Sequence, residues 1–226
     1  MCGRFTFRKP SPAALASFGV TEAAEGPRAS FNVAPGQTVP VVVQMGDRRM
    51  LDSYRWGLVP AWAKDPSVGY KMINARGETV ADKPAFRQAF LQRRCLILAD
   101  GFYEWKQGTK AKVPHYFTLP HEEAFAFAGL WERWEGPDGI GLLTCTIVTV
   151  EANELMRPFH HRMPVILEPD DYGRWLDPGF RNKAALLALL RPYPSARMRV
   201  RPVSTLVNSP KNDGPQCLLP LEPEPE

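Results

Sequence analysis

The sequence predicts a single domain of the α+β class, in which mainly antiparallel sheets curve into a barrel-like core with a few peripheral helices. Several segments have the β-branched, aromatic and alternating character of strands, whereas the helical candidates are fewer and short. The 23 prolines are spread along the chain, which favours many short elements over long helices. Alternating strand–helix order is missing, so a doubly wound nucleotide-binding fold is disfavoured.

The predicted elements follow from local patterns. The strands are expected at 39–44, 50–56, 95–100, 116–119, 124–130 and 142–150. A helix over 11–18 begins with Ser-Pro, a good cap followed by a good first helical residue. A helix over 83–92 places Phe86, Phe90 and Leu91 at helical spacing. Two further helices are expected at 170–176 and 183–190, the last ending before Arg191-Pro192.

Length and composition limit the class of protein. The chain has 226 residues, 44% of them apolar, which suffices for a full core and argues against disorder. We expect one domain over 1–219, followed by a Pro/Glu-rich tail over 220–226 that is disordered. No apolar run approaches the roughly 20 residues of a membrane-spanning helix, and no signal peptide is visible. The expected location is therefore the cytoplasm, in a bacterium associated with the nucleoid. The net charge of +4 permits an acidic partner such as nucleic acid without demanding one.

The four cysteines are Cys2, Cys95, Cys145 and Cys217, and none forms a C-x-x-C pair. A zinc ribbon or a redox dithiol is therefore not expected, and the sequence predicts neither a metal nor a cofactor. Cys95 and Cys145 lie in apolar runs and are expected to be small buried hydrophobes. All four are compatible with a reducing compartment.

Cys2 is informative because of its position. Removal of Met1 would leave a thiol and a free α-amine on the same residue, and the amine, with a pKa of about 8, is partly unprotonated at neutral pH. A nearby cation such as Arg4 is expected to help the thiol ionise. Such a 1,2-aminothiol can condense with an aldehyde to a five-membered thiazolidine, or its thiolate can attack an acyl group. The alternative is an accidental cysteine in a frayed terminus.

Several polar and aromatic residues are further candidates, each with a plainer alternative. Glu104 lies between two aromatic residues, which is expected to raise its pKa and suit it to acid–base catalysis; otherwise it is a surface carboxylate. His160 or His161 could transfer a proton. Asn74 and Arg76 share a face if their segment is extended, and could grip a polar substrate. The candidates also include Arg162 as a phosphate ligand, and Trp62, which is either a base-stacking platform or a core residue.

Six motifs occur in order along the chain. They are Cys-Gly-Arg-Phe at 2–5, Asn-Val-Ala-Pro at 32–35, Trp-Gly-Leu-Val-Pro at 56–60, Ile-Asn-Ala-Arg at 73–76, Asp-Gly-Phe-Tyr-Glu-Trp at 100–105 and His-His-Arg-Met-Pro at 160–164. Together with the pairs Val203-Ser204, Val207-Asn208 and Lys211-Asn212, they resemble the SRAP family, named for SOS-response-associated peptidases, whose members process abasic sites in DNA. The resemblance extends to about Leu219.

The resemblance implies a role for each matching residue. Cys2 would link covalently to the ring-opened abasic deoxyribose, with Asn74 beside it, Glu104 as the acid–base group, and His160, which lies two places before Arg162, protonating the sugar hydroxyl. The phosphate-binding set would be Arg4, Arg76 and Arg162. The DNA channel would be lined by Asn32, Pro35 and Thr149. Trp62 would be an aromatic wedge, and Ala63 stands where some relatives carry a second aromatic residue, which weakens the expected stacking.

The implied function is a covalent thiazolidine crosslink to abasic sites in single-stranded DNA, including single-strand/double-strand junctions, by a monomer that removes its own Met1 and has a side lyase activity. It would shield the lesion during the SOS response to DNA damage. Two alternatives remain open. One is an N-terminal-cysteine hydrolase, either a peptidase or an amidohydrolase. The other is a non-covalent single-strand-binding module that uses arginine and tryptophan.

Overall fold

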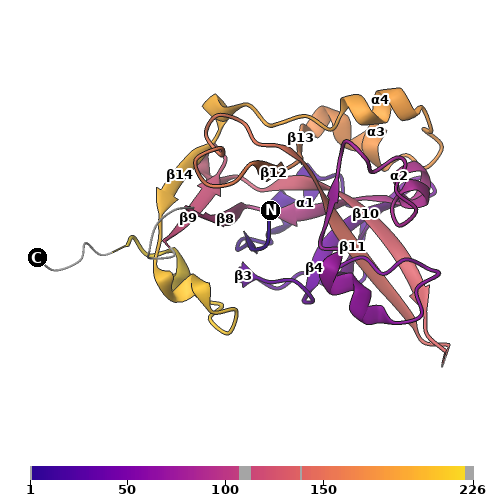
Figure 1. The fold of residues 1–226 in the computed structure, drawn as a ribbon, viewed down its shortest axis with the longest axis horizontal. Helices are drawn as coiled ribbons and strands as arrows, with labels where there is room; N and C mark the ends of the chain where they lie inside the picture. The colour runs from indigo at the N-terminus through magenta and orange to yellow at the C-terminus, as the bar shows by residue number, and fades with distance from the viewer. Residues whose placement is uncertain (1, 107–112, 138, 222–226) are drawn as a thin grey trace, which may run out of the picture.

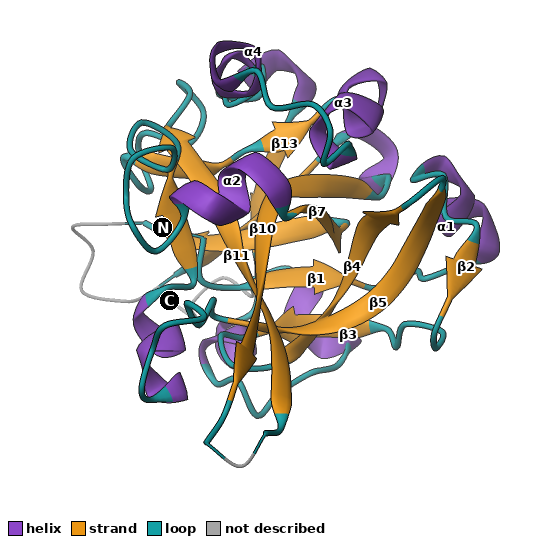
Figure 2. Ribbon diagram, turned by 90° about the vertical axis from the view of Figure 1, so that its right-hand side faces the viewer, coloured by secondary structure: helices purple, strands orange, loops and turns teal. Residues whose placement is uncertain are grey.

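The core of the protein is a closed ring of five strands. The computed structural model describes residues 2–106, 113–137 and 139–221. The ring consists of β4 (Thr38–Met45), β5 (Arg48–Trp56), β7 (Arg94–Ala99), β10 (Phe125–Glu135) and β11 (Gly141–Glu151). A short parallel pairing of β5 with β11 closes it, and Trp56 lies opposite Cys145 there. The four other pairings in the ring are antiparallel (Figure 2). This confirms the predicted barrel-like core.

A second sheet carries the start of the chain. It has the order β14 (Arg199–Pro202), β9 (Pro114–Thr118), β8 (Gly101–Trp105), β1 (Phe5–Phe7) and β3 (Ser30–Val33), and all its pairings are antiparallel. In Figure 1 its β8, β9 and β14 lie on the side of the molecule that holds the C-terminal segment. The short strands β2 (Glu22–Ala23), β6 (Asn74–Arg76), β12 (Arg162–Pro164) and β13 (Ile166–Leu167) extend the larger sheet.

The six predicted strands all form, but four of the five strands of the second sheet were not predicted, namely β1, β3, β8 and β14, and neither were the short strands β2, β6, β12 and β13. The strand predicted over 95–100 ends as β7 at Ala99, and β8 begins at Gly101 because the chain changes sheets at Asp100. Gly101 leaves room for the buried Tyr116 ring of β9: a Cβ there would lie 2.1 Å from the Tyr116 hydroxyl oxygen, so a larger residue would displace the ring.

The helices are short and peripheral, as predicted. They are α1 (Pro12–Ser17), α2 (Arg87–Gln92), α3 (Tyr172–Leu176) and α4 (Lys183–Ala188). Ser11 caps α1, since its hydroxyl accepts the Ala14 N–H at 3.2 Å. The helix predicted over 83–92 begins only at Arg87, because Phe86 has a φ of −122°, outside helical geometry. Single 3₁₀ turns occupy Pro66–Lys71, Pro120–Glu122, Pro169–Asp171, Ser195–Arg197, Thr205–Asn208 and Pro215–Leu218.

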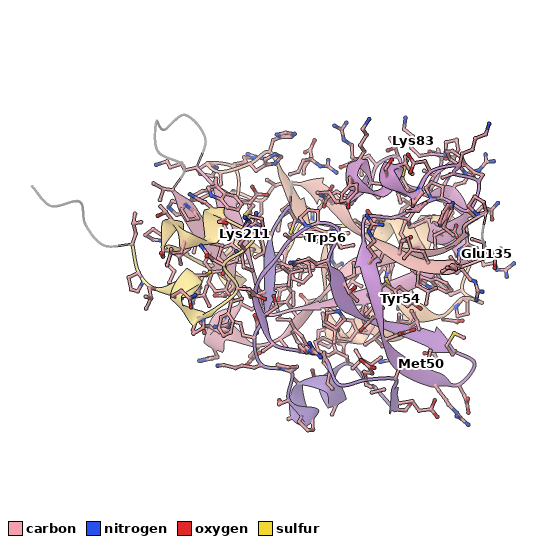
Figure 3. All side chains as sticks on the ribbon, turned by 90° about the horizontal axis from the view of Figure 1, so that it is seen from below. Met50, Tyr54, Trp56, Lys83, Glu135 and Lys211 are labelled. Atoms are coloured by element: carbon pink, nitrogen blue, oxygen red, sulfur yellow. The ribbon has the colours of Figure 1, made fainter. Side chains whose placement is uncertain are left out.

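Aromatic rings join the two sheets. Phe5 of β1 packs edge-on against Trp56 at 5.1 Å and against Phe127 at 5.7 Å between ring centroids. Phe102 and Phe117 stack at 5.2 Å on the same side of the second sheet. In Figure 3 Trp56 lies in the interior of the molecule, and it is fully buried. The first strand is therefore held by the barrel core, not frayed.

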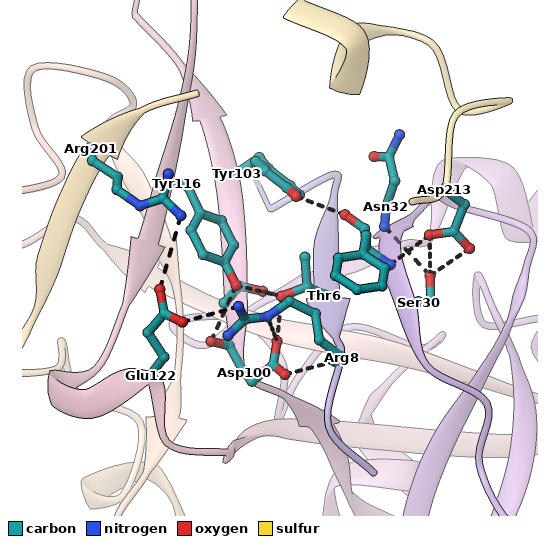
Figure 4. A network of polar contacts seen from close by, with 12 residues as sticks. Thr6, Arg8, Ser30, Asn32, Asp100, Tyr103, Tyr116, Glu122, Arg201 and Asp213 are labelled. Carbon is teal, nitrogen blue, oxygen red and sulfur yellow. Dashed lines mark hydrogen bonds and ion pairs between the residues drawn. The ribbon is translucent and has the colours of Figure 1, made fainter. Parts of the chain in front are cut away.

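A buried polar network ties β1 to its neighbours (Figure 4). The Thr6 hydroxyl donates to Asp100 at 2.5 Å, and it also lies 2.7 Å from the Tyr116 hydroxyl. The Arg8 backbone N–H and guanidinium donate to the same Asp100 carboxylate at 2.7 and 3.1 Å. Glu122 pairs with Arg8 from the other side. Because each charge has a partner, the network fixes β1 despite its burial.

The C-terminal segment closes over the second sheet. Val203, Val207 and Cys217 pack against Tyr103 and Tyr116 in a small separate apolar cluster. Cys95 and Cys145 are buried as predicted, and all four cysteines are free. Of the tail predicted over 220–226, Pro220 forms a bridge with Val203, and residues 222–226 lie outside the described residues. In the part of the chain that the structure describes, no helix has the length and apolar character needed to cross a membrane.

A candidate active site around Cys2

Cys2 is a fixed and buried residue. Its side chain and backbone have no exposed surface. Its carbonyl oxygen accepts a hydrogen bond from the Asn74 side-chain N–H at 2.9 Å. Asn74 comes from β6, which pairs in parallel with β11, so that Asn74 lies opposite Ile147. The backbone of β6 is also held at Ile73, whose carbonyl accepts from the Trp56 indole at 2.8 Å. The barrel therefore positions the start of the chain through one amide side chain.

Burial controls the acidity of the Cys2 thiol. It raises the pKa of the thiol far above its ordinary value, and the carboxylate of Glu104 raises it further. The expectation that the Arg4 charge makes the thiol easier to ionise is wrong, because the Arg4 guanidinium donates to Asn32 and to the Val207 carbonyl, at 2.8 and 2.7 Å. A hydrogen bond from the Arg4 backbone lowers the pKa of the thiol, but burial outweighs it. The resting thiol is protonated, so the attacking step needs a base to accept its proton.

Glu104 is the candidate base. It lies on β8 and is only 6% exposed, and burial raises the pKa of its carboxyl to about 7. This confirms the raised pKa predicted from its aromatic neighbours. A carboxyl that titrates near neutral pH can both accept and return a proton. The charge of the Glu104 carboxylate contributes to the raised pKa of the Cys2 thiol, which places the two acidic groups in one site.

His160 has a defined protonation pattern. Its Nδ1 accepts the Arg162 backbone N–H at 2.9 Å, so the proton of the neutral ring is on Nε2. Burial lowers the pKa of His160 to about 4, and the stacked ring of His161, 4.3 Å away between centroids, contributes to the lowering. His160 is therefore a neutral hydrogen-bond donor at physiological pH.

His115 is a residue that sequence reasoning missed. It lies directly opposite Glu104 in the pairing of β8 with β9, which puts both side chains on one face of the sheet. Its ring packs against Phe159 at 4.6 Å, immediately before His160 in the chain. His115 thus connects the Glu104 and His160 parts of the site. The strand predicted over 116–119 began one residue too late to include it.

The predicted DNA-contacting residues differ in where they point. Asn32 is fully buried, and its amide donates to three backbone carbonyls of the C-terminal segment, those of Val207, Ser209 and Asn212. Thr149 is also buried, and Pro35 is half-buried. The direct contacts expected of Asn32 and Thr149 with DNA stay predictions. In this structure both side chains serve the packing of the protein.

The predicted phosphate ligands also differ. Arg162 is 7% exposed and forms a two-pronged ion pair with Glu78, at 2.7 and 2.8 Å, together with a hydrogen bond to the Thr149 carbonyl. Arg76 is exposed at the end of β6, and its side chain makes no hydrogen bond or ion pair to any described residue. Arg76 is accessible to a phosphate as the protein stands, whereas Arg162 is engaged.

Trp62 projects from a loop whose backbone is held in place by neighbouring residues. The ring is 65% exposed. The loop folds tightly because Gly57 has a φ of +127°, and a Cβ there would lie 2.6 Å from the Gly69 carbonyl oxygen. The Trp134 indole donates to the Ala63 carbonyl at 2.6 Å. An exposed tryptophan on a fixed loop, beside Lys64 and Lys71, suits base stacking and not a core role.

The structure therefore brings Cys2, Asn74 and Glu104 into one buried site, with His160 connected to it through His115 and Phe159. Among the described residues there is no group of three histidine, cysteine or acidic side chains that could hold a metal. The arrangement has a nucleophile, an acid–base carboxyl and a neutral imidazole donor. Such a set is suited to covalent chemistry with proton transfer.

Known proteins resemble this chain along nearly its whole length. The family model described as SOS response associated peptidase (SRAP) matches residues 1–210. An abasic site processing protein, YoqW of Bacillus subtilis, is 45% identical over 221 residues, which cover 96% of this chain and 99% of the relative. The abasic site processing protein HMCES of Gallus gallus is 36% identical and is matched over 86% of this chain and 67% of its own length.

Solved structures share the fold. A protein of Bacteroides thetaiotaomicron superposes with a TM-score of 0.88 at 24% identity, covering 98% of this chain and all of that one. A protein of Bordetella bronchiseptica superposes with a TM-score of 0.77 at 26% identity, over 90% of this chain and all of that one. With the family match over residues 1–210, these likenesses lead to one conclusion: the chain belongs to the SRAP family.

Proposed function

We propose that this protein processes abasic sites in DNA, by forming a covalent thiazolidine between Cys2 and the ring-opened deoxyribose of an abasic site in single-stranded DNA. The relatives named abasic site processing proteins support the substrate. The observation that carries the chemistry is the burial of Cys2 between a fixed amide and a carboxyl whose pKa is about 7. Removal of Met1, which frees the α-amine, is part of the proposal.

The first step is imine formation. The α-amine attacks the C1′ aldehyde, and loss of water gives the imine. Glu104 accepts a proton from the attacking amine and returns one to the departing hydroxyl, which its raised pKa allows near neutral pH. Asn74 holds the Cys2 carbonyl, and its Oδ1 is buried with no hydrogen-bond partner among the described residues. This acceptor is available to the amine or to a sugar hydroxyl.

The second step closes the ring. The thiol sulfur adds to the imine carbon, the thiol proton moves to Glu104, and a proton is delivered to the imine nitrogen. His160 donates from Nε2 to the open-chain sugar oxygen. Because a ring replaces the open imine, the product is the more stable of the two. The imine also permits a slower loss of the 3′ phosphate, which accounts for a side lyase activity.

The exposed residues support single-stranded DNA as the substrate. Trp62 and the basic residues near it offer a stacking surface to an unpaired base next to the lesion, and Arg76 offers a phosphate contact. We propose that a monomer binds single-stranded DNA, including strands that adjoin a duplex. A plain binding module would show the same affinity for intact and abasic strands.

The test uses a uracil-containing single strand treated with uracil-DNA glycosylase. A heat-stable protein–DNA band is expected with the wild type and none with Cys2→Ala. Cys2→Ser retains the amine and is expected to give a linkage that is trapped by borohydride but lost without it. Intact mass of the free protein reports removal of Met1. If the wild type, with Met1 removed, gives no heat-stable band, the proposal fails. Ammonia release from glutamine would support a hydrolase instead.

A further inference from the structure

A second polar pocket lies beside the candidate active site, at the ends of β6, β11 and β12. Its lining residues come from these strands and from the loop between β11 and β12, and they are Arg76, Glu151, Ala152, Arg157, His161 and Arg162. Arg157 and His161 belong to no role assigned above. His161 stacks on His160, so the pocket directly adjoins the imidazole of the active site.

The loop that carries Arg157 and His161 is held in place at several points. The Ala152 N–H donates to the His161 carbonyl at 3.0 Å, which closes the loop at its base. Asn153 accepts the Met156 N–H at 2.9 Å through its side chain, and its amide donates to the Tyr193 carbonyl at 2.7 Å. The backbone positions of Arg157 and His161 are therefore set before any ligand binds, which lowers the entropic cost of binding.

The charges of the pocket favour an anion. Arg162 is neutralised by its ion pair with Glu78. The side chains of Arg76 and Arg157 are both exposed and make no hydrogen bond or ion pair within the described parts of the chain. Glu151 is the opposing charge at the edge of the pocket. Two available guanidinium groups outweigh one carboxylate, and the His161 ring adds a hydrogen-bond donor.

We propose that this pocket binds one backbone phosphate of the damaged strand, with Arg157 and His161 as ligands next to Arg76. The inference rests on the proposed function. Because His161 is stacked on His160, the bound phosphate would lie at a fixed number of nucleotides from the sugar in the active site. The pocket would thus set the register of the strand, while Cys2 does the chemistry.

The experiment measures non-covalent binding of abasic single strands to the full chain carrying Cys2→Ala, at several salt concentrations. Arg157→Ala is expected to weaken binding roughly fivefold and to reduce the magnitude of the salt slope by about 0.7, the value for one phosphate contact on a single strand. His161→Ala is expected to weaken binding less. Arg87→Ala is the matched control, because Arg87 is an exposed arginine of α2 outside the pocket.

A set of strands with one neutral methylphosphonate linkage, placed in turn at each position around the lesion, identifies the phosphate. At one position the methylphosphonate linkage is expected to weaken binding of the Cys2→Ala protein but not of the same protein with Arg157→Ala. Equal behaviour of Arg157→Ala and Arg87→Ala, or a methylphosphonate penalty in Arg157→Ala at every position, would overturn the inference. Crosslinking by the wild-type Cys2 protein is measured separately, so its failure is distinguishable from failure of the pocket.

Discussion

The polar side chains assigned to DNA binding form two groups that their sequence motifs do not distinguish. Arg4, Asn32 and Arg162 are turned into the protein, where backbone carbonyls or an acidic partner engage them. Arg76 and Trp62 are exposed on supported segments. The first group builds the site and the second is available to the substrate. A substitution in the first group should therefore cost folding stability, whereas one in the second should cost only binding.

The largest effect on stability is expected at Glu104, the buried carboxyl of the site. Its pKa rises from an ordinary 4.5 in the unfolded chain to about 7 in the folded protein. The folded state therefore holds a proton that the unfolded state has lost, so stability falls as pH rises from about 4.5 to about 7. Glu104→Gln removes this loss. The unfolding free energy of the variant minus that of the wild type should therefore be about 3 kcal/mol larger at pH 8 than at pH 4.

Urea denaturation at the two pH values measures this gain. Glu135→Gln is the control, because Glu135 is exposed at the end of β10 and its ion pair with Arg133 is solvent-exposed, so its effect on stability should be small and the same at both pH values. The crosslinking rate of Glu104→Gln should fall at the same time, so a catalytic loss accompanies a stability gain. Equal stability differences at both pH values would show that Glu104 is not the poorly solvated acid described above.

The next largest effect is expected for Arg4→Met. The change leaves the Asn32 amide oxygen and the Val207 carbonyl without their charged donor, which costs about 2 kcal/mol of unfolding free energy. Arg76→Ala is the matched change in the exposed group and should stay within about 0.5 kcal/mol of the wild type. Denaturant titration of both variants tests the contrast. If Arg4→Met instead reduced the salt slope of DNA binding at unchanged stability, Arg4 would belong to the exposed group.

The larger sheet was predictable because its signals are local, whereas only β9 of the second sheet was predicted. The six predicted strands are rich in β-branched, aromatic and other apolar residues and all form, and Ser11 caps its helix as the Ser-Pro pair indicates. The strand β8 was missed because Gly101, which leaves room for the Tyr116 ring, resembles a bend in the sequence. The helix predicted from residue 83 starts later because the backbone of Phe86 is not helical, which apolar spacing does not report.

The site was predictable in its residues but not in its geometry. Motif order identified Cys2, Asn74 and Glu104, which the structure brings together. No local pattern reports that the Arg4 guanidinium reaches Val207, more than 200 positions along the chain. His115 was missed for the same reason, since its relation to Glu104 depends on strand register. Whether an arginine is buried or exposed depends on contacts between segments that are distant in the sequence, and the spacing within a motif does not predict these contacts.

The smallest effect on stability is expected at Trp62, and it is the sharpest test of the exposed group. The ring is 65% exposed, so Trp62→Ala should change the unfolding free energy by less than about 0.5 kcal/mol. Loss of a stacked base should nevertheless weaken DNA binding about tenfold.

Ile140→Ala is the control, at a side chain that is 68% exposed on the hairpin of β10 and β11, and it should change neither stability nor DNA binding. Fluorescence anisotropy with an abasic strand, beside denaturation of the same samples, separates the two quantities. A stability loss without a binding loss would mean that Trp62 packs against the protein in solution. The division into residues that stabilise the fold and exposed residues that bind DNA would then fail at Trp62.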